Sequence, residues 1–227
     1  GSGDVALRAL PLLTPHWRVI ALIRRPEAAA AWRALGARPL LADLDDKNSL
    51  SRIAGLADAV LYTAPPPEQG RIDPRMRKVL SQLAKTGSLP QQIVYISTSG
   101  VYGNADGKWL SETASLRPTS PRAQRRVDAE RCLRAFAVAH GTALTILRAP
   151  GIYAAERLPL ARLQNGTPLI NASEDSISNH IHASDLARLC AAALQRRRSG
   201  IRVYNACDSQ PLPVGEWYDQ LADTLGL

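Results

Sequence analysis

The segments QIVYIS (92–97) and ALTILR (143–148) enclose the helical pattern RAQRRVDAERCLRAFAVAH (122–140). Both outer segments are short, largely apolar and rich in β-branched residues, as strands buried on both faces are. A strand, a helix and a second strand in this order predict a parallel pair of strands with the helix as the crossover between them. The architecture of the chain can be read outward from this unit.

The same alternation of strands and helices continues on either side. Further strands are predicted at the short apolar runs Arg18–Arg24, Pro39–Ala42, Asp58–Thr63 and Arg202–Ala206. Helices are predicted, from apolar period and from Pro and Gly at their ends, at Asp4–Leu13, Pro26–Leu35, Asn48–Leu56, Pro74–Lys85, Ser184–Gln195 and Gly215–Thr224. The chain is therefore predicted to be an α/β protein with a doubly wound parallel sheet.

Composition is that of an ordinary globular protein. With 227 residues, 45% of them hydrophobic and 21% charged, the chain can bury a core without disulfides or a structural metal. No apolar run approaches the roughly 18 residues of a membrane-spanning helix and no signal segment opens the sequence, so a cytoplasmic protein without a membrane partner is expected. The cysteines are far apart and are expected to be buried thiols in a reducing compartment: Cys132, Cys190 and Cys207.

The charge balance permits an anionic partner but does not identify one. The formal net charge is +8, and the run Arg196-Arg197-Arg198 fits the solvated end of a helix. Nucleic-acid binding is disfavoured because aromatic residues make up only 5% of the chain and are not interleaved with the basic ones. The scattered tryptophans are interpreted as packing residues: Trp17, Trp32, Trp109 and Trp217.

The chain opens with Gly1-Ser2-Gly3-Asp4-Val5-Ala6, which fits the G-x-G-x-x-G/A fingerprint of dinucleotide-binding proteins. Such glycines let the backbone approach a pyrophosphate at the positive end of the following helix. A fingerprint of this kind follows a strand, and no strand precedes it here; a cloning remnant at Gly1-Ser2 would fit the same letters. If the fingerprint is genuine, we expect that the central first strand is missing from this sequence.

The end of the next predicted strand bears on the choice of nucleotide. About twenty residues after the glycines, this strand ends in Arg24-Arg25. An acidic residue at this place takes the ribose hydroxyls of NAD, whereas guanidinium groups favour the extra 2′-phosphate of NADP. NADP is therefore the expected cofactor and NAD the alternative, while a solvated pair of loop arginines is the interpretation without a nucleotide.

Further motifs follow the predicted strands in order. Besides the opening glycines, they are Asp43-Leu44-Asp45, Thr63-Ala64-Pro65, STSGVYG (97–103), LRAPGIY (147–153) and NHIHASDLA (179–187). With these motifs, which span nearly the whole chain, the sequence resembles the extended or atypical short-chain dehydrogenase/reductases, a family of NAD-dependent epimerase/dehydratase-like proteins. The STSGVYG segment is the most specific of them.

The resemblance implies positions for cofactor and substrate on a Rossmann-type fold. Asp43 and Leu44 would face the adenine. Thr98 falls on the catalytic Ser/Thr position, where its hydroxyl would hydrogen-bond a substrate oxygen. The residues expected at the cofactor are Gly1, Ser2, Gly3, Asp4, Val5, Arg24, Arg25, Asp43, Leu44, Ala64, Pro65, Arg126, Pro150 and Ile152.

The sequence departs from this family at the catalytic Tyr-x-x-x-Lys pair. Aligned on Ala129-Glu130, Arg122 stands at the tyrosine position and Arg126 at the lysine position. A guanidinium group keeps its proton, so Arg122 cannot replace a phenol as acid and base. Arg126 would keep the ribose-binding part of the role of the lysine.

Arg122 and Arg126 share one helix stripe with core-facing residues, so both are predicted at the cleft end of that stripe. Two cations at this spacing repel each other. A phosphate or carboxylate between them would relieve the repulsion, as would Glu130 beside Arg126 or other bridging carboxylates. Tyr102 and Tyr153 are further candidates for the acid if nearby arginines depress their pKa, although packing with a structural hydroxyl bond is the simpler interpretation.

His180 and His182 lie on one face of a predicted strand, as two metal ligands would. No third ligand beyond Asp185 is evident, so no metal site is expected. A capping segment explains the motif instead, with Ser184 or Asp185 near a helix start and His180 hydrogen-bonded to the chain.

Two lobes and two leading functions are predicted. Residues 1–150 and 179–206 form the NAD(P)-binding domain, and residues 151–178 and 207–227 form a small substrate lobe. The first function is that of an NADP(H)-dependent oxidoreductase or epimerase-like enzyme for a small, anionic carbonyl or sugar-type substrate, in which Thr98 polarises the oxygen. The second is that of an NADP-binding sensor or scaffold without catalysis, which the missing tyrosine favours. A homodimer is expected from the family alone, and a nucleic-acid-associated protein is the weakest alternative.

Overall fold

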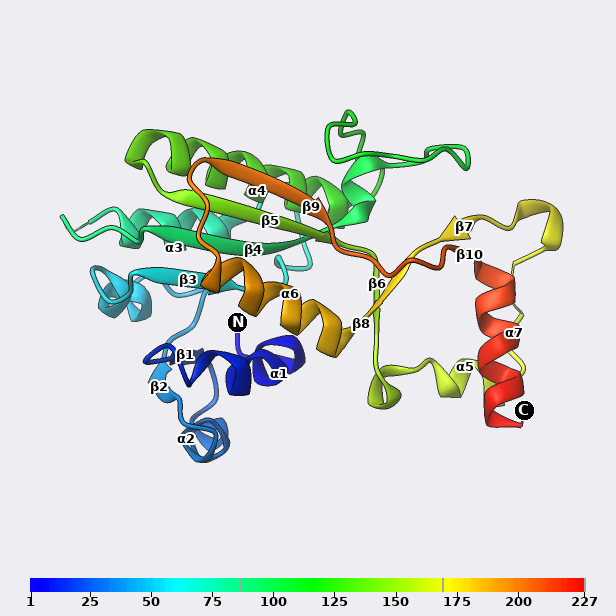
Figure 1. Cartoon of the computed structure of the whole chain (residues 1–227), viewed down its shortest axis with the longest axis horizontal. Coiled ribbons are helices and arrows are strands. Elements are labelled where there is room, and N and C mark those ends of the chain that lie inside the picture. Colours follow the sequence, from blue (N-terminus) through cyan, green and yellow to red (C-terminus); the bar gives the residue numbers. More distant parts are fainter. Residues whose placement is uncertain (86, 169, 227) are drawn as a thin grey trace.

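The computed structural model describes residues 1–85, 87–168 and 170–226. Its centre consists of parallel strands with helices on both faces (Figure 1), which confirms the predicted α/β class. One sheet contains, in spatial order, β3 (Ala59–Tyr62), β4 (Gln92–Thr98), β5 (Ala143–Ala149) and β9 (Ile201–Asn205). A separate parallel pair consists of β1 (Ile20–Ile23) and β2 (Arg38–Leu41).

Helices cover the larger sheet on both sides. α3 (Pro74–Leu83) and α4 (Pro121–His140) pack on one face, and α1 (Asp4–Leu13) and α6 (Ala183–Gln195) pack on the other. Alternate residues of β4 belong to these two cores, because successive side chains of a strand point to opposite faces. This burial on both faces explains why the strands read as continuous apolar runs rather than as alternating patterns.

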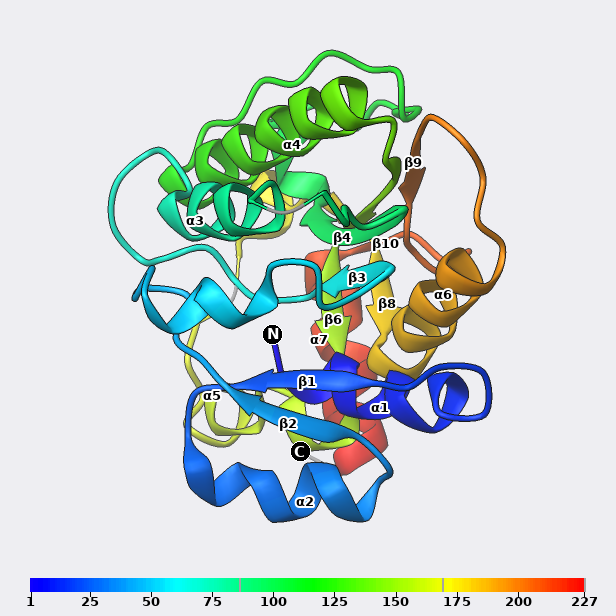
Figure 2. The same ribbon diagram turned by 90° about the vertical axis from the view of Figure 1, so that its left-hand side faces the viewer.

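β1 and β3 face each other across a cavity instead of pairing. The cavity measures about 640 Å³ and is lined by apolar side chains such as Leu22, Trp32 and Leu61. In Figure 2 the N-terminus lies between the two strands. The facing edges of β1 and β3 form no ladder within the described ranges.

Two of the predicted helices are shorter than expected. Asn48–Leu56 forms only the 3₁₀ segment Ser49–Ile53. The Ser49 hydroxyl bonds to backbone groups of the preceding turn, and such side-chain bonds compete with a regular helix. Pro26–Leu35 begins as a 3₁₀ turn and continues as α2 (Ala29–Ala34).

The segments after β5 contain several short strands, and the sequence predicted only the one that carries His180 and His182. β6 pairs with β8 in parallel, and β7 pairs with β10 antiparallel. Their bounds and those of the two neighbouring helices are β6 (Gly151–Tyr153), α5 (Leu160–Gln164), β7 (Ile177–Ser178), β8 (His180–His182), β10 (Leu212–Pro213) and α7 (Val214–Leu225). Strands of two or three residues carry no recognisable period. In Figure 1, α5 and α7 lie apart from the main sheet.

Some expectations about burial are wrong. Cys190 is buried as expected, but Cys132 is half-buried and Cys207 is exposed. Trp109 is 87% exposed on the long loop after β4 and is not a packing residue. Within the part of the chain that the structure describes, no helix has the length and hydropathy needed to cross a membrane.

Candidate functional site

The opening glycines lie against the end of β3. The Thr63 hydroxyl donates a hydrogen bond to the Gly1 carbonyl oxygen at 2.9 Å. A Cβ atom at Gly1 would lie 2.7 Å from the backbone nitrogen of Ala64, too close for any side chain. The N-terminal turn and the segment after β3, which the sequence analysis assigned to the cofactor, are therefore adjacent.

The N-terminus of α1 is open to an anion. Gly3 is the N-cap residue and supplies no side-chain hydrogen bond, and a Cβ atom at Gly3 would meet nothing within 4 Å. The N–H groups of the first turn are thus available to a ligand. Asp4 accepts a hydrogen bond from Arg8 at 2.8 Å, and Val5 is buried in the core. The open space and the uncapped turn fit the pyrophosphate of a dinucleotide.

The two arginines after β1 lie in different surroundings. Arg24 lines a hollow of about 710 Å³ together with Pro65. The side chain of Arg25 is 74% exposed, stands 3.9 Å from Glu27 and does not line this hollow. Only Arg24 is thus placed beside the segment that follows β3.

The predicted adenine-binding residues follow β2. Asp43 is half-buried in a turn, where its backbone N–H donates to the Ser49 hydroxyl at 2.9 Å. Leu44 lines the cavity between β1 and β3. Asp45, the third residue of this motif, accepts hydrogen bonds from Arg75 at 2.8 and 2.5 Å, and this guanidinium group lowers the pKa of Asp45.

Thr98 is the last residue of β4 and begins the 3₁₀ turn Ser99–Tyr102. Its Oγ1 accepts a hydrogen bond from the Gly100 N–H at 3.2 Å, and its side chain is half-buried. Because this bond uses the oxygen as acceptor, the hydroxyl proton remains available for another oxygen. The geometry suits a residue that polarises a carbonyl or alcohol oxygen.

Arg122 and Arg126 lie in separate environments, although both are on α4. Arg122 is exposed and lines the hollow that contains Arg24. Arg126 is only 6% exposed, and its Nη1 donates to the Tyr95 hydroxyl at 3.0 Å and to the Ile96 carbonyl at 2.8 Å. Arg126 is thereby held against the carboxyl end of the sheet.

Glu130, one of the groups that could have relieved the repulsion between Arg122 and Arg126, has a different partner in the structure. Glu130 instead forms a buried ion pair with Arg148 of β5, at 2.8 Å between Nη2 and Oε2, and accepts a hydrogen bond from Ser97 at 2.6 Å. Sequence reasoning missed this pair because 18 residues and a change of element separate its members.

The Tyr102 hydroxyl belongs to the same buried network. It donates to Asn205 at 2.6 Å and accepts from Arg148 at 2.9 Å. The tyrosine is 6% exposed, so its ring is packed and its hydroxyl is engaged on both sides. This arrangement matches the structural interpretation of Tyr102 made from the sequence.

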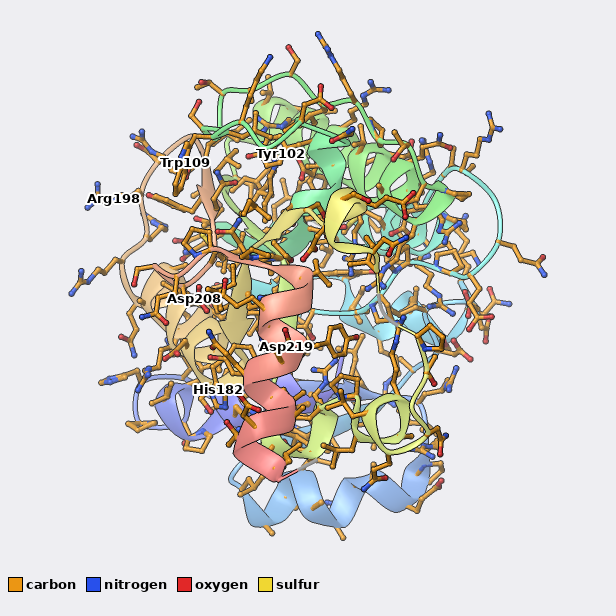
Figure 3. The ribbon with its side chains drawn as sticks, turned by 90° about the vertical axis from the view of Figure 1, so that its right-hand side faces the viewer. Tyr102, Trp109, His182, Arg198, Asp208 and Asp219 are labelled. Carbon is orange, nitrogen blue, oxygen red and sulfur yellow. The ribbon has the colours of Figure 1, made fainter. Side chains whose placement is uncertain are left out.

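Tyr153 lies between the two histidines of β8. Its ring makes edge contacts with His180 at 6.4 Å and His182 at 5.3 Å between centroids, and His180 stacks on Trp217 at 4.7 Å. Burial and the nearby Asp208 raise the pKa of Tyr153, so the condition of a depressed pKa is not met. Figure 3 shows His182 and Tyr102 in different regions of the molecule.

His182 supplies a cap that the sequence analysis assigned to its neighbours. Its Nδ1 accepts from the Ser184 N–H at 3.3 Å at the start of α6. Two further residues assigned to the cofactor, Pro150 and Ile152, are half-buried. Pro150 follows β5, and Ile152 lies in β6. No group of three or more metal-ligating side chains occurs in residues 1–85, 87–168 and 170–226.

Arg75 and Arg125 also line the hollow, and the sequence analysis did not assign them to the site. Arg125 directly precedes Arg126 and therefore does not share the helix stripe on which Arg122 and Arg126 were predicted to lie. Arg75 lies in the first turn of α3, where its fork holds Asp45. The sequence shows that arginines are frequent between residues 122 and 134. It does not show that Arg122 and Arg125 line the hollow, that Arg126 is buried, or that Arg131 is exposed.

Comparisons with known proteins identify the family and the fold of the chain. The profile of a family described as NAD(P)H-binding matches residues 1–197. A functionally unknown conserved protein from Silicibacter pomeroyi is 31% identical, with a TM-score of 0.79 over 100% of this chain and 77% of its own. A protein from Methylobacillus flagellatus, provisionally assigned as an NAD-dependent epimerase/dehydratase, is 29% identical, with a TM-score of 0.78 over 100% of this chain and 80% of its own.

A more distant structure shares the fold. The dTDP-glucose 4,6-dehydratase DesIV from Streptomyces venezuelae, solved with NAD bound, is 23% identical and has a TM-score of 0.82 over 100% of this chain and 79% of its own. This likeness shows a common epimerase/dehydratase-type fold. No curated protein matches the sequence significantly.

Proposed function

Because this chain belongs to the family of NAD(P)H-binding proteins, we propose that it is an NADP(H)-dependent oxidoreductase or epimerase-like enzyme for a small, anionic carbonyl or sugar-type substrate. The observation that carries the proposal is the glycine turn packed on Ala64, with the uncapped N-terminus of α1 beside it. A glycine turn followed by a helix N-terminus supports the binding of a dinucleotide pyrophosphate.

The cofactor, when bound, supplies or accepts a hydride. Arg24 would pair with the 2′-phosphate, since it follows β1 and lines a hollow, while Arg25 is turned to solvent. The residues that would hold the remainder of the nucleotide are Gly1, Ser2, Gly3, Asp43, Leu44, Ala64, Pro65, Arg126, Pro150 and Ile152.

Thr98 would bind the reacting oxygen of the substrate. The Gly100 N–H donates a hydrogen bond to Oγ1 of Thr98, so Thr98 is the acceptor in this bond. The hydroxyl proton of Thr98 can therefore be donated to a substrate oxygen. Arg122 keeps its proton at every physiological pH and acts by charge, not by proton transfer. The segments 151–178 and 207–227 would cover the substrate. Tyr153 and Trp217 of these segments both contact His180 of the other domain.

A second function is favoured by the same helix. Arg122 stands where the family resemblance implies a catalytic tyrosine, and Arg126 donates hydrogen bonds to the Tyr95 hydroxyl and the Ile96 carbonyl oxygen. A protein with this arrangement can retain nucleotide binding and lose turnover. An NADP-dependent sensor or scaffold is therefore the alternative proposal.

Cofactor binding followed by turnover separates these functions. The full-length protein is titrated with NADPH and NADH by fluorescence. Turnover is then measured in two ways: as NADPH oxidation with a panel of carbonyl compounds that carry carboxylate or phosphate groups, and as product formation from sugar-type substrates, since an epimerase-like enzyme regenerates its cofactor in each cycle. Binding with turnover supports the enzyme, and binding without turnover supports the sensor. If neither nucleotide binds, both proposals are wrong.

A further inference from the structure

A hollow with an excess of positive charge lies beside the proposed cofactor site. It measures about 710 Å³ and is bounded by the end of β1, the proline-rich turn after β3 and the first turns of α3 and α4. Its charged lining residues are Arg24, Glu68, Arg75, Arg122 and Arg125. Four guanidinium groups thus surround one space that contains a single carboxylate.

The charges of this hollow are not balanced within the protein. Arg75 is neutralised by a two-pronged pair with Asp45. Arg24, Arg122 and Arg125 form no ion pair with any side chain that the structure describes. Three unpaired cations against Glu68 leave an excess of two positive charges around the space.

Arg125 is a buried residue that also lines the hollow. It is only 5% exposed, and its Nη1 donates a hydrogen bond to the Gly70 carbonyl oxygen at 2.5 Å. This bond to a neutral carbonyl group leaves the positive charge of Arg125 without an opposite charge beside it. An anion in the hollow would supply that charge.

We propose that this hollow binds a phosphate group, with Arg122 and Arg125 as its principal ligands and Arg24 as a third. A phosphate monoester carries a charge close to −2 at neutral pH, which matches the excess in the hollow. Guanidinium forks also match the arrangement of phosphate oxygens better than lysine does. The N-terminus of α4, whose first turn carries Arg122, adds the positive end of a helix of 20 residues.

This inference deepens the proposed function and rests on it for the molecule that carries the phosphate. That molecule is either the substrate or NADP, whose 2′-phosphate has the same chemistry. The position of Arg122 is notable because the related enzymes have their catalytic tyrosine there. A cation in its place would turn a proton-transfer position into a substrate-anchoring one.

Titration with inorganic phosphate tests the site directly. Binding to the full-length protein is followed by ³¹P NMR line broadening at constant ionic strength, adjusted with KCl. We expect saturable binding that weakens roughly tenfold or more in Arg122→Gln and Arg125→Gln, since each removes a charge-assisted contact. Arg131→Gln is the matched control, because Arg131 is exposed on the same helix and does not line the hollow.

Arg122→Gln carries the test if Arg125→Gln fails to fold, because Arg122 is exposed. Thermal unfolding verifies that each variant is folded. The proposal is overturned if phosphate does not bind to the wild type, or if Arg122→Gln and Arg131→Gln bind it as the wild type does.

A competition experiment identifies the source of the phosphate. If inorganic phosphate lowers the affinity for NADPH but not for NADH, the hollow holds the 2′-phosphate of NADP. If the affinities for both nucleotides are unchanged while phosphate is bound, the hollow holds a phosphate group of the substrate. Nucleotide binding without any phosphate binding overturns this inference and leaves the proposed function intact. Phosphate binding without nucleotide binding overturns the proposed function and leaves the phosphate site in place.

Discussion

Two arginines on α4 show how one turn of helix separates two kinds of chemistry. Arg122 is solvent-exposed at a hollow with other cations, whereas Arg126 is buried and bonded to the Tyr95 hydroxyl and the Ile96 carbonyl. Neither guanidinium group can give up its proton at physiological pH. Arg122 is thus suited to bind an anion, and Arg126 is suited to fix the end of the sheet.

Arg24→Asp is expected to change the preference between nucleotides. Loss of a charge-assisted contact with the 2′-phosphate weakens NADPH by roughly ten- to a hundredfold, and a carboxylate here accepts the ribose hydroxyls of NADH. Fluorescence titration with both nucleotides measures the ratio. Arg25→Asp is the neighbouring control and should have a smaller effect, because Arg25 is outside the hollow. An unchanged ratio in Arg24→Asp would reject the assignment.

Thr98→Val is expected to lower kcat if the wild type turns over a substrate. Removing one hydrogen-bond donor from a developing oxyanion reduces kcat by about a hundredfold or more in enzymes of known mechanism. Nucleotide affinity should stay unchanged, and Thr98→Ser should restore most of the rate because it keeps the hydroxyl. Steady-state kinetics on the three proteins measure this effect. Full activity in Thr98→Val would show that another group polarises the substrate.

The start of α3 is held by a buried aspartate. Asp73 Oδ1 accepts from the Met76 N–H at 3.0 Å, and the Asp73 N–H donates to Asp128 at 2.8 Å. The other carboxylate oxygen, Oδ2, is buried without a hydrogen-bond partner. Burial raises the pKa of Asp73, although the bond from Met76 acts in the opposite direction. The helix cap therefore contributes a hydrogen bond and, at neutral pH, an unfavourable buried charge.

Asp73→Asn is expected to stabilise the protein at neutral pH. Asparagine keeps the capping oxygen and removes the charge, and the gain is about 1.4 kcal/mol for each pKa unit by which Asp73 is raised. Since the folded-state pKa lies above the unfolded-state value, the gain is largest above the folded-state pKa. It disappears as the pH falls below the ordinary aspartate value of about 3.9.

Urea unfolding at a series of pH values measures this difference. Asp219→Asn on α7 is the control, because Asp219 is an exposed residue and its substitution removes a charge that is not buried. A gain that is independent of pH would contradict the buried-charge explanation.

The whole molecule combines a continuous core with a separate strand pair. β4 and β5 each have a strand neighbour on both sides, whereas β1 and β2, among the strands that the structure describes, pair only with each other. The cavity of about 640 Å³ separates this pair from β3. Local opening requires fewer contacts to be broken in the β1–β2 pair than in the larger sheet.

Amide hydrogen exchange should reveal this division. Protection factors in β1 and β2 are expected to be about tenfold or more below those in β4 and β5, since the pair is held by fewer neighbours. Mass spectrometry of exchanged peptides covers both regions, and peptides from α4 report on global opening. Equal protection in the two sheets would show that the molecule opens as one unit.

Much of the fold follows from short-range patterns. The apolar run at 92–97, the glycine stop signals and the proline starts predict strands and helices because the chain periodicity of each element is a local property. The glycine turn at Gly1–Gly3 is recognisable for the same reason: only residues without a side chain permit the close approach to Ala64. The arginine at position 122, where the family resemblance implies a tyrosine, is likewise visible in the sequence.

Long-range placement accounts for the rest of the site. Arg148 of β5 forms an ion pair with Glu130 of α4. Arg75 donates a hydrogen bond to Asp45, and Arg125 donates one to the Gly70 carbonyl oxygen. Arginines on α4 look alike in sequence, but their surroundings differ. Arg126 is hydrogen-bonded to residues of β4, whereas Arg122 and Arg125 line a hollow. Such partnerships depend on how distant segments pack against one another, and electrostatic pairing follows distance in space rather than distance along the chain.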